Sequence, residues 1–408
     1  MDFQYIEGGV CAAKGFRANG IHCGIRKNKS KRDLALILSE KEAAAAAVYT
    51  TNLVKGAPIA VDKKHLENGR ASAIICNSGN ANTCNADGFE KAIEMCAMTA
   101  KQCGIETHDV VVGSTGVIGM PLDTAPIRNS IAALYAGLTA GLEGSKFAAE
   151  AIMTTDTAIK EVAVTFEVGG VLCKMGGIAK GSGMIHPNMA TMLIFITCDA
   201  CISPEMLQKA LSADIKTTFN MISIDGDTST NDMVTILSNG MAGNTEIVSE
   251  GEDFDTFCKA LHMLTVRLCR MIAADGEGAT KLIECSVSGA KTLEIAQKTA
   301  KSVICSSLLK AAMFGADANW GRVLCAIGYS GAPVDVNKID VAFRSAKGII
   351  TVCENGAGVD FSEALAKKIL LEKEIDILID LNDGNHTATA WGCDLTYDYV
   401  KINGDYRT

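Results

Sequence analysis

Apolar and polar residues recur with two different periods along this chain. Alternating or β-branched apolar runs predict strands at 33–39, 72–79, 109–119, 161–170, 191–200, 232–240, 286–296, 339–345 and 375–381. Periods of three to four residues predict helices at 90–102, 125–138, 204–220, 254–274 and 362–371. Ser362 is a suitable N-cap for the last helix, because its hydroxyl can accept a backbone N–H.

The predicted strands and helices are mixed without a regular strand–helix–strand order. This favours an α+β fold in which sheets and helices form layers. Short glycine-rich links between neighbouring strands, such as 162–171 and 191–198, favour mostly antiparallel or mixed sheets. The alanine-rich stretch KEAAAAAVYTTN, residues 41–52, predicts a helix that leads into a strand. No stretch has the composition of a linker, and the most polar breaks are 180–188 and 240–253.

Composition narrows the class of protein. The chain has 408 residues, of which 48% are hydrophobic and 21% charged, so it can bury a substantial core. Its net charge of −9 argues against nucleic acid and anionic membranes as partners. The first ten residues are acidic where a signal peptide would be basic, and no apolar run has the length of a membrane span. We therefore expect a cytoplasmic protein.

The cysteines predict thiols rather than a disulfide framework. Sixteen cysteines are spread evenly along the chain, which is too large to need disulfide staples. One CxxC pair occurs at Cys198 and Cys201, without a second pair or a neighbouring histidine. We expect buried, inert thiols there and no metal site.

Several common active-site motifs are missing. The chain lacks a phosphate-binding GxxxxGK[ST] loop and a GxGxxG fingerprint after a strand. The GxSxG elbow also fails, because Lys180 stands two residues before Ser182. The acidic segment DGDTSTND, residues 225–232, lacks the spacing of an EF-hand and its closing glutamate. We interpret it as a polar loop of caps and turns.

The stretch KGSGMIHPNMATML, residues 180–193, places a hydroxyl residue where a glycine-rich run meets an apolar strand. A threonine hydroxyl is a weak nucleophile, but the α-amine of the same residue can serve as its base if the chain is cut before it. The pKa of such an amine is about 7.7–8.0, which suits that task. Thr191 is therefore a candidate nucleophile, released by cleavage after Ala190. The alternative is an ordinary first residue of a buried strand.

Other residues could complete an acyl-transfer site. The loop GSTGVIG, residues 113–119, follows a strand and can direct backbone N–H groups and the Thr115 hydroxyl at an oxyanion. Lys180 could bind a carboxylate, and Glu277, between two glycines, could bind a substrate ammonium. A solvated lysine and an ordinary turn glutamate are the alternatives. His186 is too close in sequence to Ser182 for a catalytic pair, and we interpret it as structural.

The segment GGIAKGSGMIHPNMATMLIFITCDA, residues 176–200, strongly resembles the self-processing signature of the ornithine acetyltransferase family. This family is also called the glutamate N-acetyltransferases of arginine biosynthesis. The resemblance extends over essentially the whole chain. It includes ICNSGNANTCNADG, GSTGVIG, AIMTTDT, DGDTSTNDM, ADGEGATK and GADANWGRV in the expected order.

The resemblance implies a helix–sheet–sheet–helix sandwich of N-terminal-nucleophile type. It also implies cleavage between Ala190 and Thr191 into an alpha chain, 1–190, and a beta chain, 191–408, which fold together. Thr191 would be the nucleophile, with Thr115 and Gly116 as the oxyanion hole. The residues implied to contact substrate are Thr154, Lys180, Thr191, Glu277, Asn403 and Thr408. Thr155 and Thr157 stay open as substitutes for Thr154.

The implied reaction moves an acetyl group from N2-acetyl-L-ornithine to L-glutamate through an acetyl-threonine intermediate, without metal or organic cofactor. The sequence leaves open whether acetyl-CoA is also a donor, and the resemblance implies a heterotetramer of two alpha and two beta chains. The residues also leave two other functions open. One is an N-terminal-nucleophile amidohydrolase or aminopeptidase, in which water is the acceptor. The other is a non-catalytic ligand-binding protein with an uncut chain.

Overall fold

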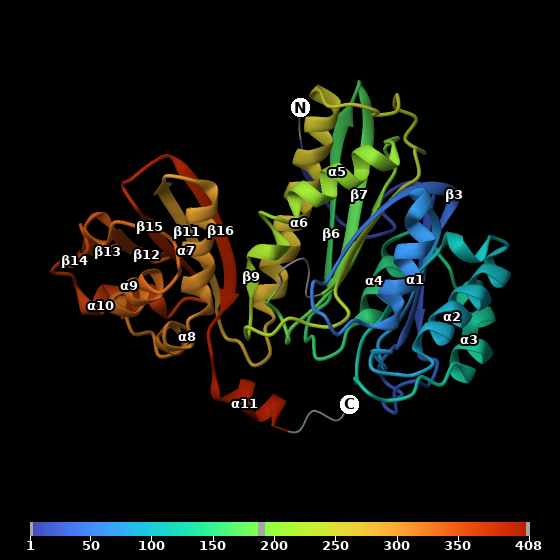
Figure 1. The fold of residues 1–408 in the computed structure, drawn as a ribbon, viewed down its shortest axis with the longest axis horizontal. Helices are drawn as coiled ribbons and strands as arrows, with labels where there is room; N and C mark the ends of the chain where they lie inside the picture. Colours follow the sequence, from blue (N-terminus) through green and yellow to red (C-terminus); the bar gives the residue numbers. More distant parts are fainter. Residues whose placement is uncertain (1–2, 187–191, 405–408) are drawn as a thin grey trace.

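The computed structural model of the chain describes residues 3–186 and 192–404. Within these residues the protein forms two lobes, each built on its own β-sheet (Figure 1). The α+β class and the mixed sheets predicted from the sequence are confirmed. Among the described helices, none is long and apolar enough to cross a membrane.

The first lobe contains a nine-stranded sheet, counted over the described residues. Its strands are β1 (Gln4–Ile6), β2 (Phe16–Ile21), β3 (Leu34–Tyr49), β4 (Arg70–Asn77), β5 (Val110–Ser114), β6 (Lys160–Val168), β7 (Val171–Lys180), β8 (Leu193–Cys198) and β10 (Met233–Ser238). They follow the order β1-β6-β7-β8-β10-β3-β4-β5, and β2 pairs with β3. The β8–β10 and β4–β5 pairs are parallel, whereas β7–β8 and β3–β10 are antiparallel.

Six helices pack around this sheet in the described part of the first lobe: α1 (Ala57–His65), α2 (Gly88–Cys103), α3 (Ala125–Ala136), α4 (Leu142–Ile152), α5 (Pro204–Asp214) and α6 (Glu252–Ala274). Helix α5 packs on β3, and α6 packs on β6 and β7. In both lobes, the described residues also form short 3-10 turns, η1 (Leu66–Asn68), η2 (Thr107–Asp109), η3 (Phe219–Met221) and η4 (Val336–Lys338).

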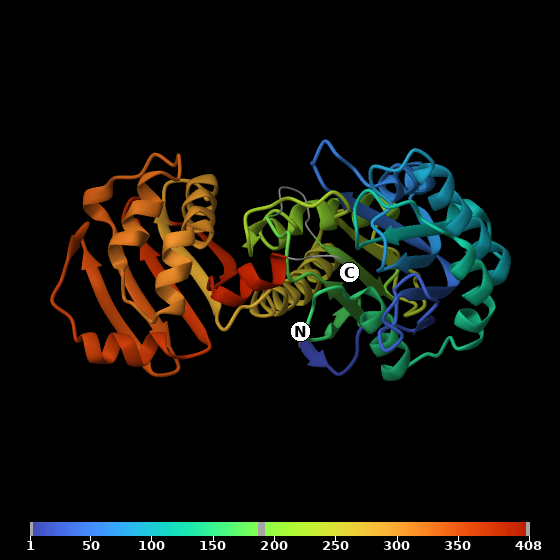
Figure 2. The ribbon, with the colours of Figure 1, turned by 90° about the horizontal axis from the view of Figure 1, so that it is seen from below.

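The second lobe contains a seven-stranded sheet, again counted over the described residues. Its strands are β9 (Ile222–Ser223), β11 (Leu282–Ala290), β12 (Asp340–Ser345), β13 (Gly348–Glu354), β14 (Ala357–Gly358), β15 (Glu374–Asp380) and β16 (His386–Cys393). Its helices are α7 (Leu293–Cys305), α8 (Ser307–Phe314), α9 (Trp320–Gly328) and α10 (Glu363–Leu370). The last helix, α11 (Tyr397–Asn403), leaves this lobe and runs back toward the first one (Figure 2).

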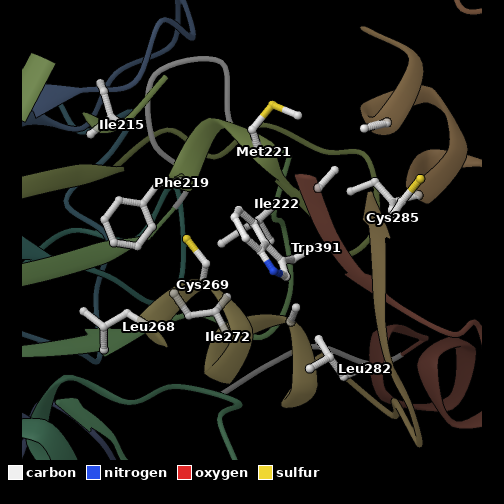
Figure 3. Packing of buried hydrophobic residues seen from close by; sticks show 14 of the residues in the cluster. Ile215, Phe219, Met221, Ile222, Leu268, Cys269, Ile272, Leu282, Cys285 and Trp391 are labelled. Atoms are coloured by element: carbon white, nitrogen blue, oxygen red, sulfur yellow. The ribbon is translucent and has the colours of Figure 1, made fainter. Parts of the chain in front are cut away.

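One hydrophobic core joins the two lobes. Strand β9 comes from the chain of the first lobe but pairs with β16, opposite Trp391. Around it, Phe219 and Ile272 of the first lobe belong to the same buried cluster as Leu282 of the second (Figure 3). Because apolar surface from both lobes is buried together, the lobes hold one another in place. Because the lobes are packed together in this way, helix α11 of the C-terminal region can reach the first lobe.

The structure corrects three local predictions. Residues 41–52 do not begin with a helix, because β3 runs through the alanines to Tyr49. Ala44 and Ala46 pack in the core on one face of β3, and Ala43 and Ala45 pack in another core on the other face. Small side chains covered on both faces suit a central strand, so tertiary packing overrides the helical propensity of alanine.

The predicted strand 286–296 ends at Ala290, and α7 starts at Leu293. The Thr292 hydroxyl accepts the Ile295 N–H at 3.2 Å, which is an N-cap that the strand pattern concealed. The structure also adds β7 in the stretch between 171 and 191, which the sequence pattern treated as a short glycine-rich link. A Cβ at Gly176 would collide with the Gly9 carbonyl, so this glycine permits close backbone packing within a strand.

Helix α5 ends at Asp214, earlier than the predicted 204–220, and a short 3-10 turn follows it. The predicted helices near 90–102, 125–138, 254–274 and 362–371 are present as α2, α3, α6 and α10. The N-cap prediction for α10 is confirmed, because the Ser362 hydroxyl accepts the Leu365 N–H at 3.3 Å.

Candidate active site

A cavity of about 360 Å³ lies where β5 and β7 end and where β8 and β10 begin. We call it the active-site cavity. Its lining residues are Ala81, Thr115, Gly116, Val117, Ile118, Thr154, Thr155, Lys180, Gly183, Met184, Met192, Leu193, Ser229, Thr230, Asn231, Asp232, Glu277 and Asn403. The cavity therefore brings together the described members of the predicted site from five distant parts of the chain.

The loop after β5 presents Thr115 and Gly116 to the cavity. The Thr115 N–H donates to the Asn77 carbonyl at 3.0 Å, so Thr115 can serve a ligand only through its hydroxyl. Gly116 has a φ of 128°, and a Cβ there would lie 2.6 Å from the Gly79 carbonyl carbon. A side chain at this position would be strained and would clash with backbone, so the loop requires glycine.

Lys180 ends β7 and pairs in register with Leu193 of β8. Its ammonium donates to the Thr115 hydroxyl at 3.5 Å, so both groups face the same space. Lys180 therefore lies at the end of a strand rather than in the glycine-rich run where the sequence pattern placed it. A cation held there beside a hydroxyl can bind a carboxylate or stabilise a developing oxyanion.

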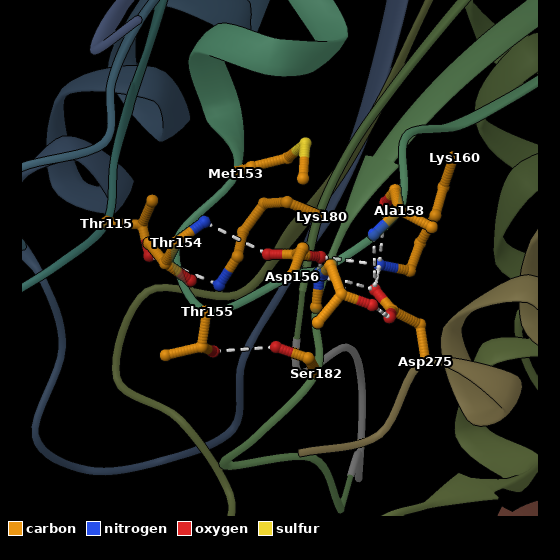
Figure 4. Close-up of polar contacts among 12 residues, drawn as sticks. Thr115, Met153, Thr154, Thr155, Asp156, Ala158, Lys160, Lys180, Ser182 and Asp275 are labelled. Carbon is orange, nitrogen blue, oxygen red and sulfur yellow. Dashed lines mark hydrogen bonds and ion pairs between the residues drawn. The ribbon is translucent and has the colours of Figure 1, made fainter. Parts of the chain in front are cut away.

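A buried network of charges lies behind Lys180 (Figure 4). Asp156 accepts from the Lys160 ammonium at 2.6 Å and from the Gly181 N–H at 2.7 Å, and Lys160 also contacts Asp275 at 2.5 Å. Burial alone would raise the pKa of Asp156, but the charges of Lys160 and Lys180 lower it to about 2. Asp156 is thus an ionised carboxylate that fixes the turn after β7.

The three threonines of AIMTTDT differ in position. Thr154 lines the cavity, and its N–H donates to Asp156 at 3.0 Å. Thr155 also lines the cavity, and its hydroxyl lies 2.7 Å from the Ser182 hydroxyl. Thr157 is exposed and hydrogen-bonded to Asp275. Two of the three candidates for substrate contact therefore lie at the cavity, and Thr157 lies outside its lining.

Glu277 and Asn403 form the side of the cavity nearest the second lobe. The Glu277 N–H donates to the Ser182 carbonyl at 2.7 Å, which ties the turn after α6 to the turn after β7. The Asn403 side-chain amide donates to the Glu277 carboxylate at 2.7 Å. Helix α11 thus brings the C-terminal region to the site, which local sequence patterns could not reveal.

Three predicted residues lie outside the described residues: Ala190, Thr191 and Thr408. Met192 and Leu193, which follow Thr191, line the cavity. The Met192 carbonyl accepts the Met233 N–H at 2.9 Å, so the start of β8 is aligned beside β10. The nucleophile and the cleavage site stay predictions.

Sequence reasoning missed Asn231 and Asp232, which it placed in an ordinary polar loop. The Asn231 amide donates to the carbonyls of Ala81 at 2.5 Å and Ser114 at 2.9 Å. Its carbonyl accepts the Thr83 and Thr230 hydroxyls, each at 2.6 Å. Asn231 therefore clamps three loops into one wall of the cavity. The available signal was an amide and a carboxyl directly before the buried apolar run that forms β10.

Asp225, at the other end of that loop, also has a structural role. Its carboxylate accepts the Met184 N–H at 2.6 Å and the Ile185 N–H at 2.7 Å. It therefore shapes the turn that borders the cavity at Met184. Over the described residues, no group of three or more His, Cys, Asp or Glu side chains is arranged to hold a metal ion.

His186 and Ser182 do not face one another as a pair. The His186 ring contacts the Ser223 hydroxyl at 3.1 Å, whereas the Ser182 hydroxyl contacts Thr155. Burial and the charge of Lys301 lower the pKa of His186 to about 4, so the ring is neutral near pH 7. Cys198 is buried, and burial raises the pKa of its thiol. Such a thiol is a poor nucleophile.

With this geometry in place, comparison with known proteins identifies the family. The profile of the ArgJ family matches residues 17–408. The chain belongs to the ArgJ family. The arginine biosynthesis bifunctional protein ArgJ of Caldanaerobacter subterraneus subsp. tengcongensis is 51% identical over 406 residues, 99% of this chain and 100% of that protein. ArgJ 1 of Clostridium acetobutylicum is 51% identical over 394 residues, 96% of each chain.

A solved structure of the ArgJ protein from Bacillus halodurans is 47% identical, with a TM-score of 0.49, over 52% of this chain and 97% of that chain. The family resemblance predicted from residues 176–200 is confirmed by the ArgJ profile and by the ArgJ proteins of Caldanaerobacter and Clostridium. The roles of the individual cavity residues stay predictions.

Proposed function

We propose that this ArgJ-family enzyme of arginine biosynthesis transfers an acetyl group from N2-acetyl-L-ornithine to L-glutamate. The observation that carries the proposal is one cavity that holds Thr115, Gly116, Lys180 and Glu277 at the start of β8. Hydroxyl and N–H donors, a cation and an anion within about 360 Å³ suit an α-amino acid and its acyl group. The names of the relatives, which are arginine biosynthesis proteins, support the pathway.

In this proposal Thr191 is the nucleophile. Its hydroxyl attacks the acetyl carbonyl while its own α-amine accepts the hydroxyl proton, and the Thr115 hydroxyl and Gly116 N–H stabilise the oxyanion. Ornithine leaves with a proton from that amine, and an acetyl ester remains on Thr191. The amine of glutamate then attacks the ester and releases N-acetylglutamate. Two substrates that use the same site in turn give ping-pong kinetics.

Lys180 and Glu277 supply opposite charges to the two α-amino-acid substrates. Lys180 is oriented toward the Thr115 hydroxyl, and Glu277 is held by Asn403, so both anchors are positioned before a ligand arrives. Preorganised anchors reduce the entropy lost on binding. Thr154 and Thr408 are proposed as further contacts to the same substrates.

The proposal includes self-cleavage between Ala190 and Thr191 into chains 1–190 and 191–408. It further includes a heterotetramer of two such pairs in the cytoplasm, and chemistry without metal or organic cofactor. Acetyl-CoA stays open as a second acetyl donor. Neither nucleic acid nor membrane is proposed as a partner, because the net charge of −9 is unfavourable for both.

Intact mass measured under denaturing conditions tests the cleavage, and an assay of acetyl transfer to glutamate tests the reaction. The proposal expects two chains that meet at Ala190–Thr191, and transfer that is lost in Thr191→Ala. A Thr191→Ala protein that is cut and active would refute the nucleophile. Acetate release without transfer would support the amidohydrolase alternative, and a single intact, inactive chain would support the ligand-binding one.

A further inference from the structure

One acidic residue on the cavity wall has no role in the mechanism above. Asp232 directly precedes β10, lines the active-site cavity and is only 3% exposed. Its Oδ2 atom is buried and has no hydrogen-bond partner among the described residues. A carboxylate oxygen in this state is unfavourable unless a ligand or another group completes it.

A second buried carboxyl at the same end of the sheet, that of Asp156, has the hydrogen-bond partners that Asp232 lacks within the described part of the chain. Asp156 accepts from the Lys160 ammonium and from the N–H groups of Gly181 and Thr154. Its pKa is lowered because these donors favour the charged form. The pKa of Asp232 is instead raised by burial, which the Ser229 hydroxyl and the Lys180 charge only partly offset. Asp232 therefore lacks the partners that make a carboxyl structural.

The strand register puts Asp232 beside the start of β8. Met233 pairs with Leu193 in the parallel β8–β10 ladder, and the Met233 N–H donates to the Met192 carbonyl at 2.9 Å. Met192 is one residue from the proposed nucleophile, and it lines the cavity together with Asp232. A group that meets the free carboxyl oxygen must therefore be inside the cavity, at the end where acyl transfer is proposed.

We propose that the Asp232 carboxyl accepts a hydrogen bond from a primary amine that takes part in acetyl transfer. This inference rests on the proposed function. Primary amines are the donor class that the reaction itself brings to the cavity. One source is the α-amine of Thr191 after cleavage, and the other is the amine of glutamate or ornithine. In either case Asp232 orients the amine nitrogen relative to the acetyl group, so its removal slows transfer rather than folding.

The test uses Asp232→Asn in the full-length, cleaved enzyme, with Asp227→Asn as the matched control. Asp227 lies in the same loop but is exposed and outside the cavity lining. Transfer from N-acetylornithine to glutamate is measured beside enzyme acetylation by p-nitrophenyl acetate, a donor without an amine. We expect Asp232→Asn to lower kcat for transfer by roughly 10- to 100-fold, the range for losing a hydrogen bond to a charged group. Asp227→Asn should have no effect.

The second assay separates the two amines. If Asp232 holds the Thr191 amine, Asp232→Asn slows both acetylation by p-nitrophenyl acetate and transfer. If it holds the substrate amine, only transfer slows. Unchanged rates in both assays would overturn the proposal. A wild-type enzyme that p-nitrophenyl acetate acetylates, but that transfers nothing to glutamate, would refute the proposed function, and the acetylation assay would still test Asp232.

Asp232→Glu guards against a purely structural explanation. It keeps the carboxyl and changes only its reach, so it should retain more transfer than Asp232→Asn when both variants melt like the wild type. Equal losses in the two folded variants would overturn the proposal, because shape rather than the carboxyl would then be decisive. If Asp232→Asn does not accumulate as folded protein, Asp232→Glu alone decides. A transfer rate of Asp232→Glu at or below roughly one-hundredth of the wild-type rate equals the whole expected loss and would also overturn the proposal.

Discussion

Two groups of buried charges lie at the same end of the nine-stranded sheet, and they are built differently. Behind the cavity, Lys160 joins Asp156 and Asp275 in a network whose oxygens and ammonium have close partners. On the cavity wall, among the residues that the structure describes, one oxygen of Asp232 has no partner and the Lys180 ammonium contacts the Thr115 hydroxyl at 3.5 Å. The comparison teaches that a buried charge with close partners marks a support, whereas an incompletely satisfied one that also lines a cavity marks a place for a ligand.

We call the group of Lys160, Asp156 and Asp275 the rear network. If this distinction holds, substitutions in the rear network should lower the free energy of unfolding, and substitutions on the cavity wall should lower the rate of acetyl transfer. Lys160→Met tests the rear network and should have the largest effect on stability. It leaves Asp156 and Asp275 buried without their shared cation, which costs about 3–5 kcal/mol. Urea unfolding of the purified protein measures the loss. Lys298→Met, which breaks an exposed pair with Glu294, is the control and should change little. Equal stability of both variants would contradict the support role.

Thr115→Ala tests whether the cavity wall determines the rate of acetyl transfer. Removal of one oxyanion donor should lower kcat by about 10²–10³-fold, without a change in the melting temperature. Thr115→Ser keeps the hydroxyl and should keep most of the activity. Steady-state kinetics of acetyl transfer and thermal melting, measured on the same preparations, give both numbers. An unchanged rate in Thr115→Ala would remove Thr115 from the oxyanion hole.

Acid should weaken the rear network through Asp156. Its pKa falls from 3.8 to about 2 on folding, so its contribution is fully present above pH 3.8 and is lost as the pH falls through 2. The contribution is on the order of 2 kcal/mol. Unfolding free energies at about pH 5 and about pH 1 measure it, since that window spans both pKa values. Asp156→Asn should remove this component of the pH dependence. If that variant keeps the full dependence, other carboxyls are responsible.

Asn403→Ala should have the smallest effect of the four. It removes the amide that holds Glu277 at 2.7 Å, and leaves the carboxylate to reorient in a partly exposed position. We expect KM for the amino-acid substrates to rise by about tenfold, with a smaller change in kcat. Asn403→Asp should be worse, because two carboxylates would repel one another. A normal KM in Asn403→Asp would show that α11 does not position Glu277 for binding.

Local sequence patterns predicted the helices and caps that are determined by residues close to one another in the sequence. The helix cap at Ser362 and the helices near α2 and α6 follow from side-chain period and capping chemistry. The alanines of β3 and the glycines of β7 were misread, because their reason lies in elements that pack on them from elsewhere in the chain. Small residues permit close packing, but the elements that pack on them decide whether the segment forms a helix, a loop or a strand.

The site shows the same division. Motifs in the sequence pointed to Thr115, Lys180 and Glu277, because each lies in a short stretch of characteristic composition. Asn231 and Asp232 carried only a weak local signal. The role of Asn231 depends on hydrogen bonds to residues 117 and 150 positions away, and that of Asp232 on an oxygen without a partner among the described residues. The approach of Asn403 to Glu277 spans 126 residues and depends on how the second lobe seats against the first.

By itself, the sequence determined the family, the mixed α+β character and the residues able to do acyl-transfer chemistry, because these depend on residue type and on spacing within short segments. Only the tertiary structure decided which of those residues share one cavity, and that Asp232 on its wall keeps an oxygen without a partner in the described part of the chain. Hydrogen bonds and desolvation depend on atoms that are close in space. The local spacing of apolar and polar residues does not indicate which distant residue will lie close enough to donate a hydrogen bond.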